Sequence, residues 1–213
     1  ELTKVGDGTL VFTGANTYNS GTRINGGSVY VNNTSGSGLG SSGVALSTVS
    51  ILGGNGSFSG TLTASGIVRP GATGNGDIGT LNVGDDVTWQ ANGTTFDFDL
   101  GTAAASQALA SSGGSTQDGL SIDGDFLKST LFQTTFPFDF QGGGENGWYK
   151  LIDWTGTTGF STNDFAATNL DSGKSGQFSI DSGSLYLEVI PEPSTLSLLA
   201  VMFGAAMWIR RRR

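Results

Sequence analysis

Apolar and polar residues alternate in short runs along most of the chain. Each run places an apolar side chain at every second position, with Thr, Ser or Asn between, and stops at Gly, Asn or Asp. This period of two, with β-branched and aromatic residues, predicts β-strands, and the Gly-rich breaks predict turns. No stretch before residue 195 has a helical period. The predicted strands are residues 9–13, 28–31, 49–52, 57–63, 80–83, 87–89, 94–100, 120–122, 136–140, 148–152, 177–180 and 184–189.

The spacing of these strands indicates how they are arranged. Their starts recur roughly every ten residues, so two or three strands make one coil of about 20–30 residues, a period typical of stacked repeats. In a β-solenoid each coil pairs with the next at about 4.8 Å and buries its apolar positions against its neighbours. We therefore predict an all-β fold with a β-solenoid over residues 1–100. An antiparallel β-sandwich is the alternative, because alternation alone does not fix strand order.

Two changes of composition divide the rest of the body. Residues 101–119 are rich in Ala, Ser and Gly and predict a flexible loop with room for one helical turn. Residues 120–189 return to the strand pattern and contain more large aromatic side chains. We expect this C-terminal β region to cap the open edge that a solenoid would otherwise expose.

The final segment, residues 190–213, has three parts. Pro191 and Pro193 end the last predicted strand, because proline cannot donate to a ladder. The uncharged stretch at about 195–209 predicts a short transmembrane helix. About fourteen apolar residues span roughly 21 Å, less than the ~30 Å hydrocarbon core, so a weak anchor is expected.

A basic tail follows the apolar stretch and predicts its orientation. The tail consists of four consecutive residues, Arg210, Arg211, Arg212 and Arg213. Basic residues beside a transmembrane helix favour the cytoplasmic side. We therefore expect these four residues to stop the chain in the cytoplasm and the body to lie outside.

Composition and charge exclude several functions. The chain has no Cys and no His, which excludes thiol nucleophiles, disulfides, Cys/His zinc sites and His-based triads. The formal net charge is -8, yet residues 1–209 carry 6 basic and 18 acidic side chains. An acidic body is a poor partner for phosphate backbones, so no nucleic-acid binding is expected. The chain opens at Glu1 in a strand pattern without a visible signal peptide, so we expect a mature form or a fragment.

Two pairs of carboxylates are the candidates for catalysis. Asp97 with Asp99, and Asp123 with Asp125, are spaced to share one face of a strand. Paired carboxylates can carry out glycoside hydrolysis. No basic residue or His lies near them in the sequence, so we expect solvated faces and no catalytic residues. A β-helix enzyme that uses these Asp pairs on polysaccharide is the alternative.

Neither a metal nor a cofactor is expected. The run Gly74-Asn75-Gly76-Asp77 resembles a calcium-binding β-roll loop, but it occurs once and lacks the full nonapeptide repeat. Six aromatic residues present rings that could stack on sugars, and we expect them to pack in the core or at its edges instead. They are Tyr18, Tyr30, Trp89, Trp148, Tyr149 and Trp154.

The C-terminal segment resembles a known sorting signal. The motif Pro191-Glu192-Pro193, the apolar stretch and the basic tail occur in the order of the PEP-CTERM signal of diderm bacteria. The resemblance implies an exosortase as partner. It also implies transient anchoring in the inner membrane, followed by delivery to the cell surface or the extracellular space.

The other end of the chain resembles a repeat of secreted proteins. Residues 2–31 contain Leu2-Thr3-Lys4, Gly6-Asp7-Gly8-Thr9-Leu10 and Gly14-Ala15-Asn16-Thr17-Tyr18. This pattern resembles the autotransporter-associated β-strand repeat, which implies a right-handed parallel β-helix on a secreted or surface protein.

The predicted function follows from both resemblances and the residue patterns together. We expect a non-enzymatic exported protein that is a structural or adhesive component of the envelope or extracellular matrix, with polysaccharide as a candidate ligand. A membrane-tethered protein whose tail is never processed is a further alternative.

Overall fold

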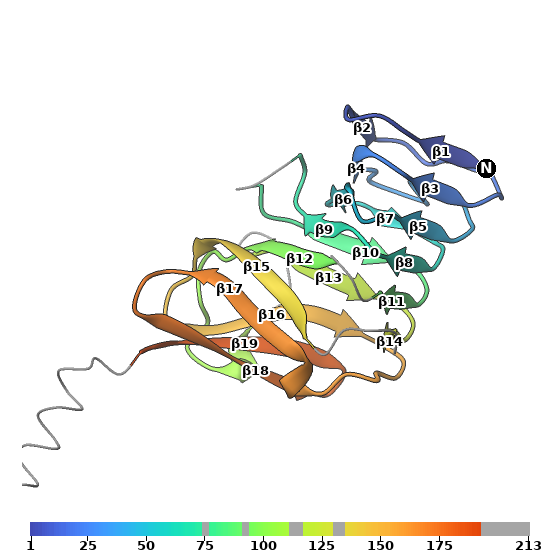
Figure 1. Ribbon diagram of the computed structural model, residues 1–213. Helices are drawn as coiled ribbons and strands as arrows, with labels where there is room; N and C mark the ends of the chain where they lie inside the picture. The colour runs from blue at the N-terminus through green and yellow to red at the C-terminus, as the bar shows by residue number, and fades with distance from the viewer. Residues whose placement is uncertain (74–76, 91–93, 111–116, 130–134, 193–213) are drawn as a thin grey trace, which may run out of the picture.

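Short strands separated by tight turns stack into three sheets (Figure 1). Sheet A contains β1 (Leu2–Lys4), β3 (Thr22–Ile24), β5 (Val44–Leu46), β8 (Leu62–Ala64), β11 (Val87–Trp89) and β14 (Phe126–Lys128). Sheet B contains β2 (Thr9–Phe12), β4 (Gly27–Val31), β6 (Ser50–Gly54), β9 (Ile67–Pro70), β12 (Thr95–Asp99), β15 (Phe136–Gly143) and β17 (Phe165–Leu170). Sheet C contains β7 (Ser57–Phe58), β10 (Thr80–Val83), β13 (Gly119–Ile122), β16 (Gly147–Trp154), β19 (Ser184–Pro191) and β18 (Lys174–Asp181). This computed structural model describes residues 1–73, 77–90, 94–110, 117–129 and 135–192.

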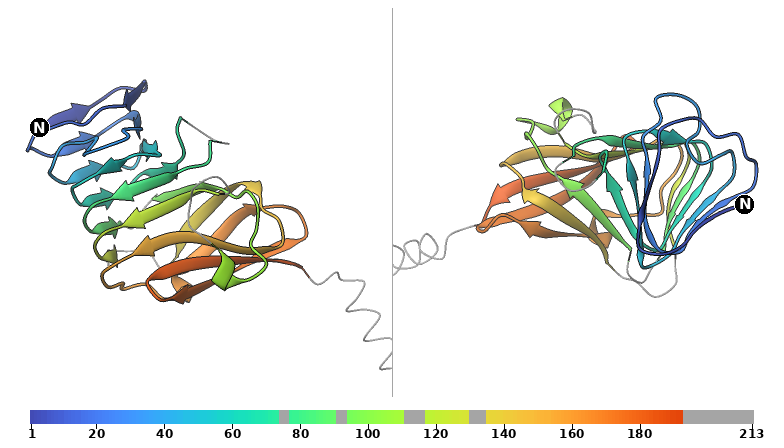
Figure 2. Two further views of the ribbon diagram at one scale, coloured as in Figure 1. Left: turned by 180° about the vertical axis from the view of Figure 1, so that it is seen from behind. Right: turned by 90° about the horizontal axis from the view of Figure 1, so that it is seen from above.

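Successive strands of sheets A and B pair in parallel, so the chain coils as a β-solenoid. Leu2 pairs with Thr22, Thr22 with Val44 and Val44 with Leu62, which gives coils of 20, 22 and 18 residues. Seen from above, these first coils superimpose (Figure 2). The parallel pairing confirms the solenoid prediction, and the antiparallel sandwich is wrong for these strands.

Later coils are longer than the predicted period. Val87 pairs with Phe126, 39 residues further along, because the connection from β12 to β13 is long. The stack nevertheless continues past residue 100, since β12 pairs in parallel with β15 and β15 with β17.

The Ala- and Ser-rich segment after β12 lies across the outer face of sheet C. The backbone N–H groups of Ala104 and Trp148 each donate to the other residue's carbonyl, both at 2.9 Å. A 3-10 turn at Gln107–Leu109 follows, and Gln107 Nε2 donates to Asp181 Oδ2 on β18 at 3.3 Å. Figure 2 shows this green segment crossing the orange and red strands. Residues 111–116 of the predicted loop lie outside the described residues.

An antiparallel hairpin covers the C-terminal end of the solenoid. After a second 3-10 turn (Thr162–Asp164) and β17, the chain forms β18 and β19, and β19 pairs antiparallel with both β16 and β18. The Phe178 ring on β18 lies 5.5 Å from the rings of Phe138 and Phe165, measured between centroids. The hairpin therefore closes the core at this end, as a cap must in a stacked fold.

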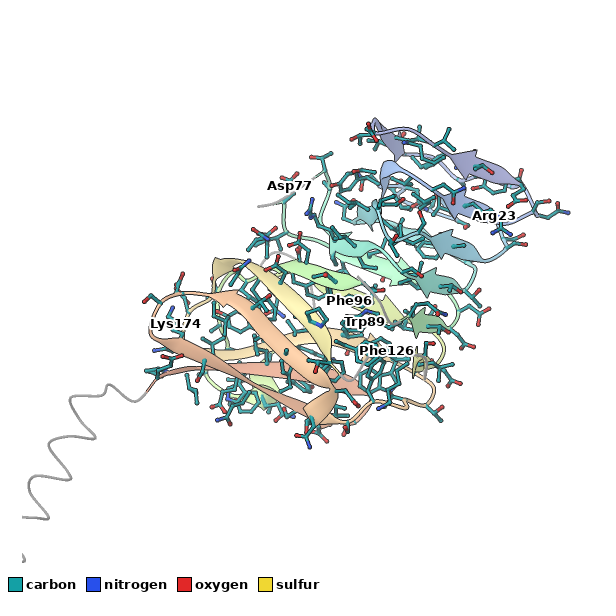
Figure 3. All side chains as sticks on the ribbon, viewed as in Figure 1. Arg23, Asp77, Trp89, Phe96, Phe126 and Lys174 are labelled. Carbon is teal, nitrogen blue, oxygen red and sulfur yellow. The ribbon has the colours of Figure 1, made fainter. Side chains whose placement is uncertain are left out.

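The core changes character along the solenoid. Its first coils bury aliphatic side chains such as Ile24, Val29 and Leu52, all 0% exposed. From β11 onward many large aromatic side chains join the aliphatic ones in the core, and the Trp89 ring contacts those of Phe96 and Phe126 (Figure 3). Longer coils enclose a wider interior, and large rings fill it at the density a protein core requires.

The described residues include no helix long and apolar enough to cross a membrane. The predicted transmembrane segment at about 195–209 lies outside these residues, so it stays a prediction. The predicted cytoplasmic stop also lies outside the described part of the chain, in all four of its residues: Arg210, Arg211, Arg212 and Arg213.

Candidate functional site

Lys4 joins the first coil to the second. Its ammonium group donates to the carbonyl oxygens of Gly6 at 2.7 Å and Gly26 at 3.0 Å, and to that of Val5 at 3.1 Å. Gly27 follows with φ of +66°, and a Cβ there would overlap the carbonyl oxygens of Gly6 and Gly8. Lys4 of the first coil and the Gly26-Gly27 turn of the second coil therefore form one contact between coils.

Asn16 and Tyr18 make two further contacts with the next coil. Asn16 Nδ2 donates to the Gly38 carbonyl at 2.7 Å, and the Ser41 N–H donates to the Tyr18 carbonyl at 3.1 Å. Gly40 has φ of +70°, and a Cβ there would overlap Tyr18. Lys4 and Asn16 each reach a carbonyl 22 residues further along the chain. The motif residues thus hold coil to coil in this arrangement.

We expect Lys4→Met to destabilise the first coils, because three carbonyl groups lose a charged donor. Hydrogen bonds to charged groups contribute about 1.5–3 kcal/mol each, and partial replacement by water reduces the loss here to about 1–3 kcal/mol. Urea unfolding of the purified protein measures this difference. Asp7→Asn, an exposed change in the same turn, is the control and should leave stability unchanged. Equal midpoints for the two variants would contradict the assignment.

Asp97 and Asp99 share one face of β12, as the sequence predicts, but this face is not solvated. Asp97 is 4% exposed and Asp99 is 8% exposed. Arg69 on the adjacent strand β9 supplies the cation: its Nε donates to Asp97 Oδ2 at 2.8 Å, and its second guanidinium nitrogen donates to the same oxygen. The Tyr30 hydroxyl also contacts this guanidinium. The expectation of an exposed pair was wrong because the outer face of sheet B is covered here.

Asp118, which the sequence did not single out, lies beside this pair. It is 0% exposed and accepts the backbone N–H of Gly79 and that of Asp99, at 2.9 and 2.8 Å. Burial raises its pKa to about 7, the charges of Asp99 and Asp97 raise it further, and the two N–H groups oppose the shift. Three carboxylates and one guanidinium therefore lie together away from solvent.

Asp123 and Asp125 do not share a strand face, which corrects the prediction. They flank Gly124 in the turn between β13 and β14. Asp125 Oδ1 accepts the Thr157 N–H at 2.6 Å, and the Asp125 N–H donates to Asp86 Oδ1 at 2.7 Å. The carboxylates of Asp86 and Asp125 thus connect the same corner of three successive coils. Their role in this arrangement is to stack turns.

The aromatic residues considered for sugar stacking pack as expected. Four are buried, at 0 to 7% exposed: Tyr30, Trp89, Tyr149 and Trp154. Tyr18 and Trp148 are half-buried. Tyr18 contacts the next coil, and the Trp148 backbone pairs with Ala104, so none of the six is fully open to solvent.

Two grooves mark the surface of the described residues. One of about 230 Å³ lies on sheet A and is lined by Arg23, Ala45 and Thr63 among others. The other, of about 420 Å³, lies between β17 and β18 beside Glu192. Neither groove is lined by a candidate Asp pair. Of the run that resembles a calcium-binding loop, residues 74–76 lie outside the described part, and Asp77 is described. The Thr73 hydroxyl donates a hydrogen bond to Asp77 Oδ2 at 2.6 Å.

Residues 2–31 match the family model of the passenger-associated-transport-repeat. This range covers β1 to β4, the first two coils, and includes Lys4, Asn16 and Tyr18. A search of curated proteins found no match to the chain. The repeat and the parallel stack together indicate a passenger-like β-solenoid, an architecture that suggests a secreted or surface protein.

Proposed function

We propose that this protein is a non-enzymatic structural or adhesive component of the cell envelope or extracellular matrix. This proposal rests on the contacts that the two candidate Asp pairs make within the fold. Asp97 neutralises Arg69 and Asp125 stacks a turn, and neither pair lines either of the two grooves described above. A long stack of coils with polar turns offers many weak contacts, which suits multivalent attachment to polysaccharide.

We further propose that an exosortase processes the C-terminal segment. The position of the motif supports this: β19 ends at Pro191, and Pro191 and Glu192 are exposed. They lie at the end of the molecule remote from the N-terminus (Figure 1). A membrane enzyme can reach this point without unfolding the cap. Pro193 and the residues after it lie outside the described part.

Expression in a diderm host with an exosortase tests the sorting proposal. Mass spectrometry of the exported protein should find that the basic tail, Arg210–Arg213, has been removed. Replacing Pro191, Glu192 and Pro193 by Ala should leave the whole tail attached. Asp123→Ala, an exposed change outside the motif, is the matched control and should be processed normally. An exported wild-type protein that retains its four Arg would instead support a permanently tethered form.

The enzyme alternative has its own test. Incubation with cell-envelope polysaccharides should release no reducing ends. If glycan cleavage occurs and Asp97→Asn, Asp99→Asn, Asp123→Asn or Asp125→Asn abolishes it, the structural proposal fails.

A further inference from the structure

One buried carboxyl group joins three strands at the corner between sheets B and C. Asp118 directly precedes β13, Gly79 directly precedes β10, and Asp99 is the last residue of β12. The Asp118 carboxyl oxygens accept one N–H from each of the other two, Gly79 at 2.9 Å and Asp99 at 2.8 Å. We refer to these three residues as the Asp118 junction.

Negative charge exceeds positive charge around the junction. Asp97 and Asp99 on β12 lie close enough to act on Asp118 electrostatically. Arg69 on β9 is the cation beside them, and it is bound through Asp97 Oδ2. Asp97 Oδ1 is buried and has no hydrogen-bond partner among the described residues.

Two more titratable groups border this cluster. Asp139 on β15 pairs with Asp97 in the ladder, and Tyr30 on β4 contacts the Arg69 guanidinium. Neither adds a positive charge. Three buried carboxylates beside one guanidinium favour the uptake of a proton, because excess charge in a low-dielectric site is costly.

We propose that the Asp118 junction is a proton-sensitive latch between sheets B and C, closed most firmly when Asp118 is protonated. A carboxylic acid can still accept both N–H groups, and it no longer repels Asp97 and Asp99. When Asp118 ionises, both repulsion and desolvation oppose the closed junction. Opening would separate the start of β10 from the end of β12. The latch does not depend on the proposed sorting route.

The direction of the pH effect follows from the position of the titration. The pKa of Asp118 in the folded protein, about 7, lies above its ordinary value of 3.8. The stabilisation of the closed junction by protonated Asp118 is therefore complete below about pH 4. This stabilisation is lost progressively as the pH rises to 7 and changes little above that. Between pH 5.5 and 7.5 the opening equilibrium should rise on the order of 20-fold. Ordinary carboxyl groups are already ionised in this window.

Amide hydrogen exchange of the purified protein tests the latch. After correction for intrinsic rates, the Gly79 and Asp99 amides should lose protection on the order of 20-fold between pH 5.5 and 7.5. In Asp118→Asn this pH dependence should disappear. Asp123→Asn, the same chemical change at an exposed position, should keep it. Equal protection at both pH values in the wild type, or an unchanged dependence in Asp118→Asn, would overturn the proposal.

A second variant keeps the test decisive if Asp118→Asn does not fold. Asp99→Asn removes one of the repelling charges, so the pKa of Asp118 should fall and exchange at Gly79 should reach its plateau at a lower pH than in the wild type. An unchanged pH profile in this variant would show that the cluster does not control the junction.

Discussion

Replacing Trp89 by Ala is expected to lower the free energy of unfolding by about 3–5 kcal/mol, the usual loss for a buried Trp. Trp89 is 0% exposed on β11, and its ring lies within 6.3 Å of six Phe rings, measured between centroids. These rings come from several coils: Phe96, Phe126, Phe136, Phe138, Phe160 and Phe165. Removing the indole opens a cavity that no single coil can refill, because each is fixed by its ladders.

Trp89→Phe is the matched control for this prediction. The indole Nε1 is buried and has no hydrogen-bond partner among the described residues. A Phe at this position keeps most of the ring contacts and removes the unpaired donor, so its cost should stay below about 1.5 kcal/mol. Urea unfolding followed by circular dichroism measures both variants. A Trp89→Ala cost as small as that of Trp89→Phe would mean that the aromatic cluster does not hold the later coils together.

Arg69→Met should also destabilise the protein by about 3–5 kcal/mol, the range for breaking a buried ion pair from one side. The Asp97 side chain is only 6% exposed, and its other oxygen already has no partner in the described part of the chain. Without the guanidinium its charge would have to be held unpaired or neutralised by a proton.

An exposed ion pair provides the comparison. Arg23 and Glu1 form a salt bridge with side chains 61% and 48% exposed, so Arg23→Met should change stability by less than about 1 kcal/mol. The double variant Arg69→Met with Asp97→Leu should recover much of the loss, because it removes both charges together. Chemical unfolding of all three variants at pH 7.5 decides the matter. If Arg69→Met costs no more than Arg23→Met, the buried pair does not stabilise the fold.

The sequence predicted the longer strands better than the short ones. Alternation over four or more residues identified strands such as β2, β10 and β12 close to their observed bounds. Three-residue strands were found only in part: β11 was predicted at 87–89, whereas β1, β3 and β5 were missed, because three residues seldom distinguish alternation from chance. Their pairing comes from the neighbouring coil, which fixes a short segment that would not be extended by itself.

The buried charge cluster could not be predicted from local sequence. Arg69 precedes Asp97 by 28 residues, and the pairing of β9 with β12 brings them together. A search for partners one coil away, instead of a few residues away, would have found Arg69. The same search would not have found Asp118, since its position depends on the long connection after β12.

The pairing of β19 has a mechanical consequence for the point where the C-terminal segment leaves the fold. This strand lies between β16 and β18 and is bonded to both, so Glu192 follows an interior strand and not an edge strand. The hydrogen bonds of an antiparallel ladder are perpendicular to its strands. A force that pulls along β19 from Glu192 would therefore act in shear on the hydrogen bonds of both ladders at once. A force that peels a strand away sideways would instead break these hydrogen bonds one by one. The fold can therefore resist tension applied at the point where the C-terminal segment leaves it.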